Sequence, residues 1–146
     1  MLPAFDQQLS TGEFFYLVTM TENQISYTVR GCIFNVYNTL GPGLLESACE
    51  AALMFEIQKA GLIARNQVAL PMIYQTVQVD VGYRLDILVE EKVIIEIKSV
   101  ETLLDVHHKQ LITYLKLSGL KLGLLVNFNT SDIVSSIFRK VNGLEE

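Results

Sequence analysis

Two short apolar runs, residues 83–89 and 93–98, constrain the fold of this chain more than any other feature. Both are rich in Ile, Leu and Val, and the charged residues Glu90, Glu91 and Lys92 separate them. Runs of this length are typical of strands, and a short polar connection between two of them favours a β-hairpin. We therefore expect these two segments to pair as neighbouring antiparallel strands.

Apolar residues at helical spacing predict helices over residues 24–40, 44–60 and 106–118, and a last amphipathic helix over 131–141. Thr130 or Ser131 is a suitable N-cap for this last helix. The segment Gly41-Pro42-Gly43 separates the first two helices, because glycine suits the position after a helix end and proline suits a first helical turn.

Three more strands are expected, over residues 68–72, 73–79 and 120–128, with an edge or a bend at Pro71. The predicted order is α-α-β-β-β-β-α-β-α, which is a mixed α/β fold. The length of 146 residues suits one domain. We expect this domain over residues 23–142, after an extension over residues 1–22.

Composition excludes several classes of protein. Half of the residues are apolar and 18% are charged, which excludes a disordered chain. No apolar run reaches the roughly 18 to 20 residues of a membrane span, and no basic cluster precedes an apolar segment as in a secretory signal. Cys32 and Cys49 lack the CxxC spacing of a metal site, so we expect a reduced cytoplasmic protein without membrane partners.

The charges are unevenly distributed along the chain. The net charge is −5, with acids in excess over residues 46–105 and bases in excess over residues 106–144. A cation site beside a phosphate-binding surface would produce this pattern, and chance scatter in a small chain would produce it too. Both interpretations stay open at this point.

Three charged residues lie inside the two apolar runs: Asp86 in the first, and Glu96 and Lys98 in the second. Side chains two positions apart on a strand share a face, so Glu96 and Lys98 point the same way. If the hairpin pivots about Glu91, Asp86 lies opposite Glu96. Two facing carboxylates repel unless a proton or a cation lies between them, and Mg²⁺ prefers such oxygen ligands.

The length of the turn decides between two interpretations. A two-residue turn at Glu90 and Glu91 would pair Asp86 with Ile95 and put Glu96 on the opposite face. A metal site therefore requires a turn of odd length or a bulge. The alternative is a surface hairpin whose polar residues face water, with a simple Glu96–Lys98 ion pair.

Asp86 together with Glu96-Ile97-Lys98 resembles the core of the PD-(D/E)xK nuclease superfamily. Gly43 and Glu46 on the preceding helix are similar to the motif of the GxxExxY family of small bacterial proteins. The similarity extends from about residue 25 to residue 128, and it includes the segments 40–47, 83–86, 106–115 and 123–128. The resemblance implies a restriction-endonuclease-like core, in which helices flank a central mixed β-sheet.

Two positions depart from the family pattern. The tyrosine that gives the family its name falls on Cys49, and a histidine common on the first helix falls on Tyr37. Neither position belongs to the metal-binding set of the superfamily. The departures therefore put in doubt only a substrate or packing role of these two side chains.

The resemblance implies a Mg²⁺-dependent nuclease acting on nucleic acid, with DNA as the expected substrate and Mn²⁺ as an alternative cation. Asp86, Glu96, the main-chain carbonyl of Ile97 and Glu46 would hold the cation, while Lys98 would orient the attacking water. Gln110 and Tyr114, at i and i+4 on a predicted helix, would help to place the substrate.

Two further expectations complete the sequence-based interpretation. Analogy to enzymes of this fold and size suggests a homodimer. A catalytically inactive module of the same fold, which binds nucleic acid or a protein partner, is the alternative function.

Overall fold

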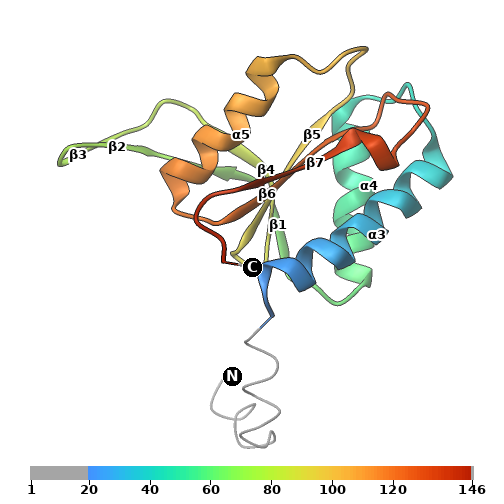
Figure 1. Cartoon of the computed structure of the whole chain (residues 1–146), viewed down its shortest axis with the longest axis horizontal. Helices are drawn as coiled ribbons and strands as arrows, with labels where there is room; N and C mark the ends of the chain where they lie inside the picture. Colours follow the sequence, from blue (N-terminus) through green and yellow to red (C-terminus); the bar gives the residue numbers. More distant parts are fainter. Residues whose placement is uncertain (1–19, 146) are drawn as a thin grey trace, which may run out of the picture.

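A five-stranded sheet with helices on both faces forms the centre of the computed structural model, which describes residues 20–145 (Figure 1). The strand order is β1-β4-β5-β6-β7. Only β5 and β6 are parallel, and the other three neighbouring pairs are antiparallel. The bounds of the sheet strands are β1 Ala64–Ala69, β4 Arg84–Val89, β5 Val93–Lys98, β6 Leu122–Asn127 and β7 Ile137–Val141.

Two helices cover one face of the sheet: α3, Glu22–Leu40, and α4, Glu46–Lys59. A capping box starts α3, since Thr21 and Gln24 exchange side-chain and backbone hydrogen bonds. Both helices contribute to the larger hydrophobic core, together with alternate residues of the central strands. Its fully buried members include Ile25, Ile33, Leu53, Ile57, Ile87, Ile95 and Leu124.

The third helix, α5, Asp105–Ser118, covers the other face. Leu111, Tyr114 and Leu115 of this helix pack in a second core with side chains of β4, β5 and β6. The helix approaches β6 closely at Gly123, where an added Cβ would lie 2.7 Å from Cδ1 of Leu111. The missing side chain therefore lets α5 lie against the sheet.

A second, two-stranded sheet consists of β2, Met72–Tyr74, and β3, Val77–Val79, and extends from the main sheet on the side of α5 (Figure 1). This arrangement corrects the strands predicted over 68–72 and 73–79. The first strand lies earlier and ends before Pro71, which has no N–H for a ladder. The second predicted strand is interrupted by a turn at Gln75, whose φ is 56°.

The helix predicted over residues 131–141 is wrong. The segment contains a single 3₁₀ turn, Val134–Ser136, followed by β7, which pairs with β6. Strand β6 is buried along its whole length, and β5 pairs with only one of its two edges. Because buried backbone N–H and C=O groups need partners, the last segment satisfies the open edge of β6 as a strand.

The predicted fold class is confirmed: a mixed sheet lies between helices, as in a restriction-endonuclease-like core. The three other predicted helices are present with ends shifted by one or two residues. The predicted extension over residues 1–22 falls mainly on residues 1–19, outside the described residues. Within residues 20–145, no helix is both long enough and apolar enough to cross a membrane.

Gly123→Ala should destabilise the protein by about 1–3 kcal/mol, because the new methyl group overlaps the buried side chain of Leu111. Gly31→Ala is the matched control: it lies inside α3 with open space around the added Cβ, and should stabilise by about 0.5–1 kcal/mol. Denaturant unfolding curves measure both. Equal effects of the two substitutions would contradict the close packing of α5 on β6.

Candidate active site

The backbone ladders on both sides of β4 are interrupted at Asp86. Strand β1 pairs with β4 on either side of this residue, but the pair Gln67–Asp86 is missing. Gln67 has a left-handed φ of 50°, which turns its backbone out of the ladder. On the other side, pairing of β4 with β5 stops at Ile87 and Ile95. Asp86 is therefore free of ladder partners on both sides.

The alternation of side chains along β4 also changes at this point. Ile87 and Val89 belong to the core under α3 and α4, whereas Leu85 and Leu88 both belong to the core under α5. Residues three positions apart share a face only where a strand is kinked. The kink at Asp86 separates the regular part of the hairpin from the part that carries the carboxylates.

The turn of the β4–β5 hairpin has the odd length that a carboxylate pair requires. Val89 pairs with Val93, so three residues form the turn, and Glu90 and Glu91 have φ angles of 53° and 55°. This register pivots about Glu91, as in the first of the two alternatives. It brings Asp86 to Glu96 and excludes the pairing of Asp86 with Ile95.

Asp86 and Glu96 are linked through backbone amides. The N–H of Asp86 donates to Oε2 of Glu96 over 2.9 Å, and the N–H of Ile97 donates to Oδ2 of Asp86 over 2.8 Å. The second oxygen of each carboxylate has no hydrogen-bond partner within residues 20–145. Every fully buried side-chain polar atom of that range has one. The two second oxygens therefore reach accessible space, where a ligand can contact them.

Burial and mutual repulsion make these two carboxyl groups hard to ionise together. Burial, and then the charge of Asp86, raise the pKa of Glu96 to about 8. Burial is also the main cause that raises the pKa of Asp86, and its hydrogen bond from Ile97 opposes the rise. The charge of Lys98 lowers both pKa values, so its ammonium group lies within electrostatic range of both carboxylates.

The carbonyl of Ile97 lies on the same side as the carboxylates. The next carbonyl, that of Lys98, accepts from the N–H of Phe128 over 2.9 Å and so faces β6. Consecutive residues of a strand direct their backbone groups to opposite edges, and the N–H of Ile97 does face Asp86. The Ile97 carbonyl therefore faces β4, where no ladder pair uses it.

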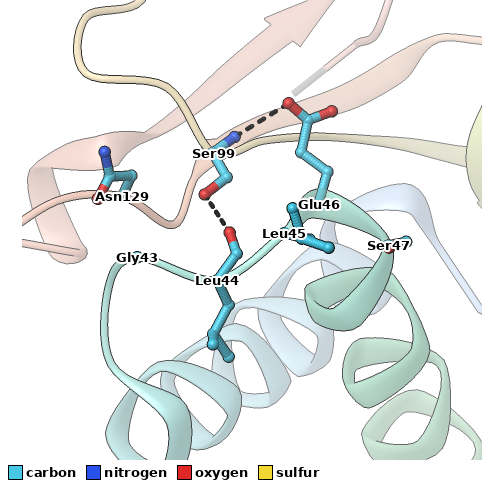
Figure 2. A pocket seen from close by; sticks show the side chains of 7 residues that line it. All are labelled: Gly43, Leu44, Leu45, Glu46, Ser47, Ser99 and Asn129. Carbon is cyan, nitrogen blue, oxygen red and sulfur yellow. Dashed lines mark hydrogen bonds between the residues drawn. The ribbon is translucent and has the colours of Figure 1, made fainter.

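Glu46 lies at the start of α4, beside the end of β5 (Figure 2). Its Oε2 accepts from the N–H of Ser99 over 3.3 Å, and the hydroxyl of Ser99 donates to the carbonyl of Leu44. These residues line an open cleft of about 510 Å³, which Asn129 bounds on its other side. The segment before α4 is thus anchored next to the residue that follows Lys98.

Gln110 and Tyr114 of α5 meet as their spacing indicated. Nε2 of Gln110 donates to the hydroxyl of Tyr114 over 2.9 Å, and Tyr114 is only 4% exposed. Burial, and then the charge of Glu96, raise the pKa of Tyr114. The ring of Tyr83 lies 5.6 Å from that of Tyr114, so the strand that leads to Asp86 and the helix meet here.

The sequence analysis missed Glu50. It lies one helical turn after Glu46, and its charge raises the pKa of both Asp86 and Glu96. Its two oxygens accept from Asn66 and Gln67, the latter being the residue that leaves the β1 ladder. The i, i+4 spacing of the two glutamates was the available signal.

Asn127 is a second missed residue. Its side chain accepts from the N–H of Val100 and donates to the carbonyl of the same residue, over 3.0 and 2.9 Å. It thereby fixes the segment after β5 to the end of β6. A polar residue that ends an apolar strand was the signal for it.

Three further residues, His107, Cys49 and Tyr37, have structural partners of their own. His107 accepts from the N–H of Leu104 and so stabilises the start of α5. Cys49, at the position of the family tyrosine, is buried in the core, and Tyr37 donates to the carbonyl of Thr130. These positions therefore serve packing and connection between elements.

Sequence comparison agrees with this geometry. The family model of the PD-(D/E)XK nuclease superfamily matches residues 23–140, most of the chain. The chain belongs to this superfamily. The comparisons with curated proteins and with solved structures gave no match.

Members of this superfamily typically depend on a divalent metal, and the residues at the kink are the candidates to hold one. Within residues 20–145, no group of three or more His, Cys, Asp or Glu side chains is arranged to hold a metal. Mg²⁺ needs no such group, because it is commonly held by one or two carboxylates, with waters and substrate phosphate as further ligands. Asp86, Glu96 and the Ile97 carbonyl supply oxygen donors of this kind, and they fit the cation.

Without metal, the protein should lose stability as pH rises from about 4.5 to about 8. Over this range the folded state keeps a proton on Glu96 that the unfolded chain has released, so the folded state binds more protons. Glu96→Gln should flatten this slope, and Glu101→Gln, at an exposed acid, should keep it. Melting curves in EDTA across this range measure the slopes. An unchanged slope in Glu96→Gln would contradict the raised pKa of Glu96.

Proposed function

We propose that this protein is a Mg²⁺-dependent nuclease that hydrolyses phosphodiester bonds in DNA. The observation that supports it most directly is the paired arrangement of Asp86 and Glu96 at an interrupted strand, with Lys98 within electrostatic range. Two acidic groups beside the positive charge of Lys98 suit a reaction in which negative charge develops on a phosphate. The choice of DNA rests on the resemblance of the sequence motifs.

Within the superfamily, we assign the chain to the GxxExxY family. Gly43 and Glu46 keep the spacing of that motif, and Gly43 has a positive φ of 92° in the connection before α4. Cys49 replaces the tyrosine in a buried position. Because Cys49 is buried and does not line the cleft, we expect the replacement of the tyrosine to leave the chemistry intact.

In the proposed reaction, the second oxygens of Asp86 and Glu96 and the Ile97 carbonyl would hold the cation, with Glu46 of α4 as a further ligand. When bound, the divalent cation supplies Lewis-acid stabilisation of the negative charge on the phosphate. The hydrogen bonds from the Asp86 and Ile97 amides keep the two carboxylates oriented. Because one oxygen of each carboxylate is fixed in this way, the other needs little rearrangement to bind.

Lys98 acts on the water that attacks phosphorus. Its side chain shares the strand face of Glu96, so its ammonium group approaches the same space as the carboxylate. There it orients the water and balances charge on the phosphate while the bond to the leaving oxygen breaks. Lysine suits this position because it is a compact charge on a flexible stem.

Helix α5 would bind the substrate strand. The Gln110–Tyr114 pair lies on its inner face near Glu96, whereas Lys109 and Lys116 are exposed on the same helix. Exposed lysines contact phosphates, and a buried tyrosine and glutamine position groups near the reacting atoms. A homodimer, the expectation from analogy, would place one such site on each strand of a duplex.

Lys98→Met should reduce Mg²⁺-dependent DNA cleavage by about a hundredfold or more, the usual size of one positioned catalytic group. Its melting temperature and Mn²⁺ binding should remain near those of the wild type, since the aliphatic stem and the cation-binding oxygens are kept. Lys121→Met, at an exposed lysine before β6, is the matched control and should cut normally. Assays on supercoiled, linear and single-stranded DNA measure the rates.

Two results would contradict the proposed nuclease. A folded wild type that binds Mn²⁺ but cuts none of these substrates would favour the inactive module of the same fold. A Lys98→Met variant that cuts normally would remove the lysine from the reaction. If this variant instead loses stability with no activity to lose, Lys98 is a structural partner of Glu96.

A further inference from the structure

The β2–β3 hairpin has an apolar face with little cover. Met72 pairs with Val79 and Tyr74 pairs with Val77, so these four apolar side chains share one face. Tyr74 is 63% exposed and Val77 is 58% exposed. A strand pair normally packs its apolar face on a core, and here the outer half of that face remains in water.

The base of this hairpin adjoins the carboxylates. The N–H of Leu70 donates to the carbonyl of Tyr83 over 2.9 Å, which closes the hairpin where β1 ends and β4 begins. The Tyr83 ring contacts Tyr114, whose pKa responds to the charges of Glu96 and Asp86. A strand of nucleic acid with a phosphate at the carboxylates therefore passes close to the base of the hairpin.

The apolar face of the hairpin suits bases better than phosphates. Within residues 70–83, Asp80 is the one charged side chain, and no lysine or arginine is present. Phosphate contacts come mainly from basic and polar groups, whereas aromatic and apolar side chains stack on bases or wedge between them. Bases paired in a duplex hide their faces, so unpaired bases are the groups that this surface can contact.

A second copy of the chain is a poorer fit for the same face. A stable interface uses about 20–30 residues and about 800 Å² on each partner. The hairpin spans only residues 72–79, and about half of its apolar face is already partly covered. Its area is therefore small for a dimer but large enough for one or two bases.

We infer that the β2–β3 hairpin contacts unpaired bases of the nucleic acid strand that extends from the cleaved phosphate along the hairpin, with Tyr74, beside the turn, as the stacking residue. This inference rests on the proposed function. It makes single strands, or ends with unpaired bases, the preferred substrates. Tyr74 lies away from the cation-binding oxygens, so its role is in substrate selection and not in the chemical step.

Fluorescence anisotropy in EDTA, which prevents metal-dependent cleavage, tests binding alone. The probes are a labelled single-stranded oligonucleotide, the same strand with abasic positions, and a blunt duplex. Tyr74→Ala should weaken binding of the intact single strand roughly fivefold to 150-fold, the range for loss of one base stack. It should leave binding of the abasic strand and of the duplex unchanged. Tyr27→Ala, which removes a tyrosine that is 83% exposed on α3, is the matched control and should change none of the three.

Each contrary result has a distinct meaning. If the wild type distinguishes intact from abasic strands, and Tyr74→Ala does not, but neither protein cuts DNA in Mg²⁺, the base contact by Tyr74 stands and the proposed nuclease fails. If the wild type cuts DNA and Tyr74→Ala binds all probes as the wild type does, the nuclease stands and the inference is overturned. A wild type that binds no probe also overturns it. So does a wild-type dimer that Tyr74→Ala dissociates in light scattering, since the hairpin then contacts a second copy.

Discussion

The exchange of hydrogen bonds between Asp86 and the second strand of the hairpin determines the rest of this site. The Asp86 amide bonds to a side-chain oxygen of Glu96, and its carboxylate accepts from the Ile97 amide. These contacts replace ladder bonds that a regular hairpin would form, so the strands separate while their backbone groups stay satisfied. Two carboxylates then lie together, each with one oxygen that has no hydrogen-bond partner in the described part of the chain and is not fully buried. Their repulsion favours any proton or cation that neutralises one of them.

The surrounding elements act on this pair from two sides. From α4, Glu46 and Glu50 bring further negative charge, and Glu50 also accepts from the side chain of Gln67, where the β1 ladder is broken. From α5, Gln110 and Tyr114 bring polar but uncharged groups. The acidic groups of α4 are suited to a cation. The uncharged groups of α5, flanked by exposed lysines, are suited to a phosphate strand. The charge imbalance along the sequence corresponds in part to this division, since Lys109 and Lys116 belong to α5.

Local patterns predicted the hairpin, the first three helices and the buried strand at 122–127, because apolar periodicity reports burial directly. They also limited the carboxylate pair to a hairpin with a turn of odd length or a bulge, and the turn has three residues. They failed for β7, since a short apolar segment suits a helix or a strand equally, and only the open edge of β6 decides. They also failed for Glu50 and Asn127, whose partners lie far along the chain. The kink at Asp86 depends on Gln67 of another strand, so no pattern of neighbouring residues predicts it.

Isothermal titration calorimetry with Mn²⁺ tests the central claim most directly, because binding to the carboxylate pair requires no substrate. The wild type should bind the cation, Asp86→Asn should lose most of that affinity, and Asp80→Asn, at an exposed acid that accepts from the Gly82 amide, should bind as the wild type does. Equal affinity of the wild type and Asp86→Asn would contradict the account, since the cation would then bind elsewhere or the carboxylate pair would have no part in holding it.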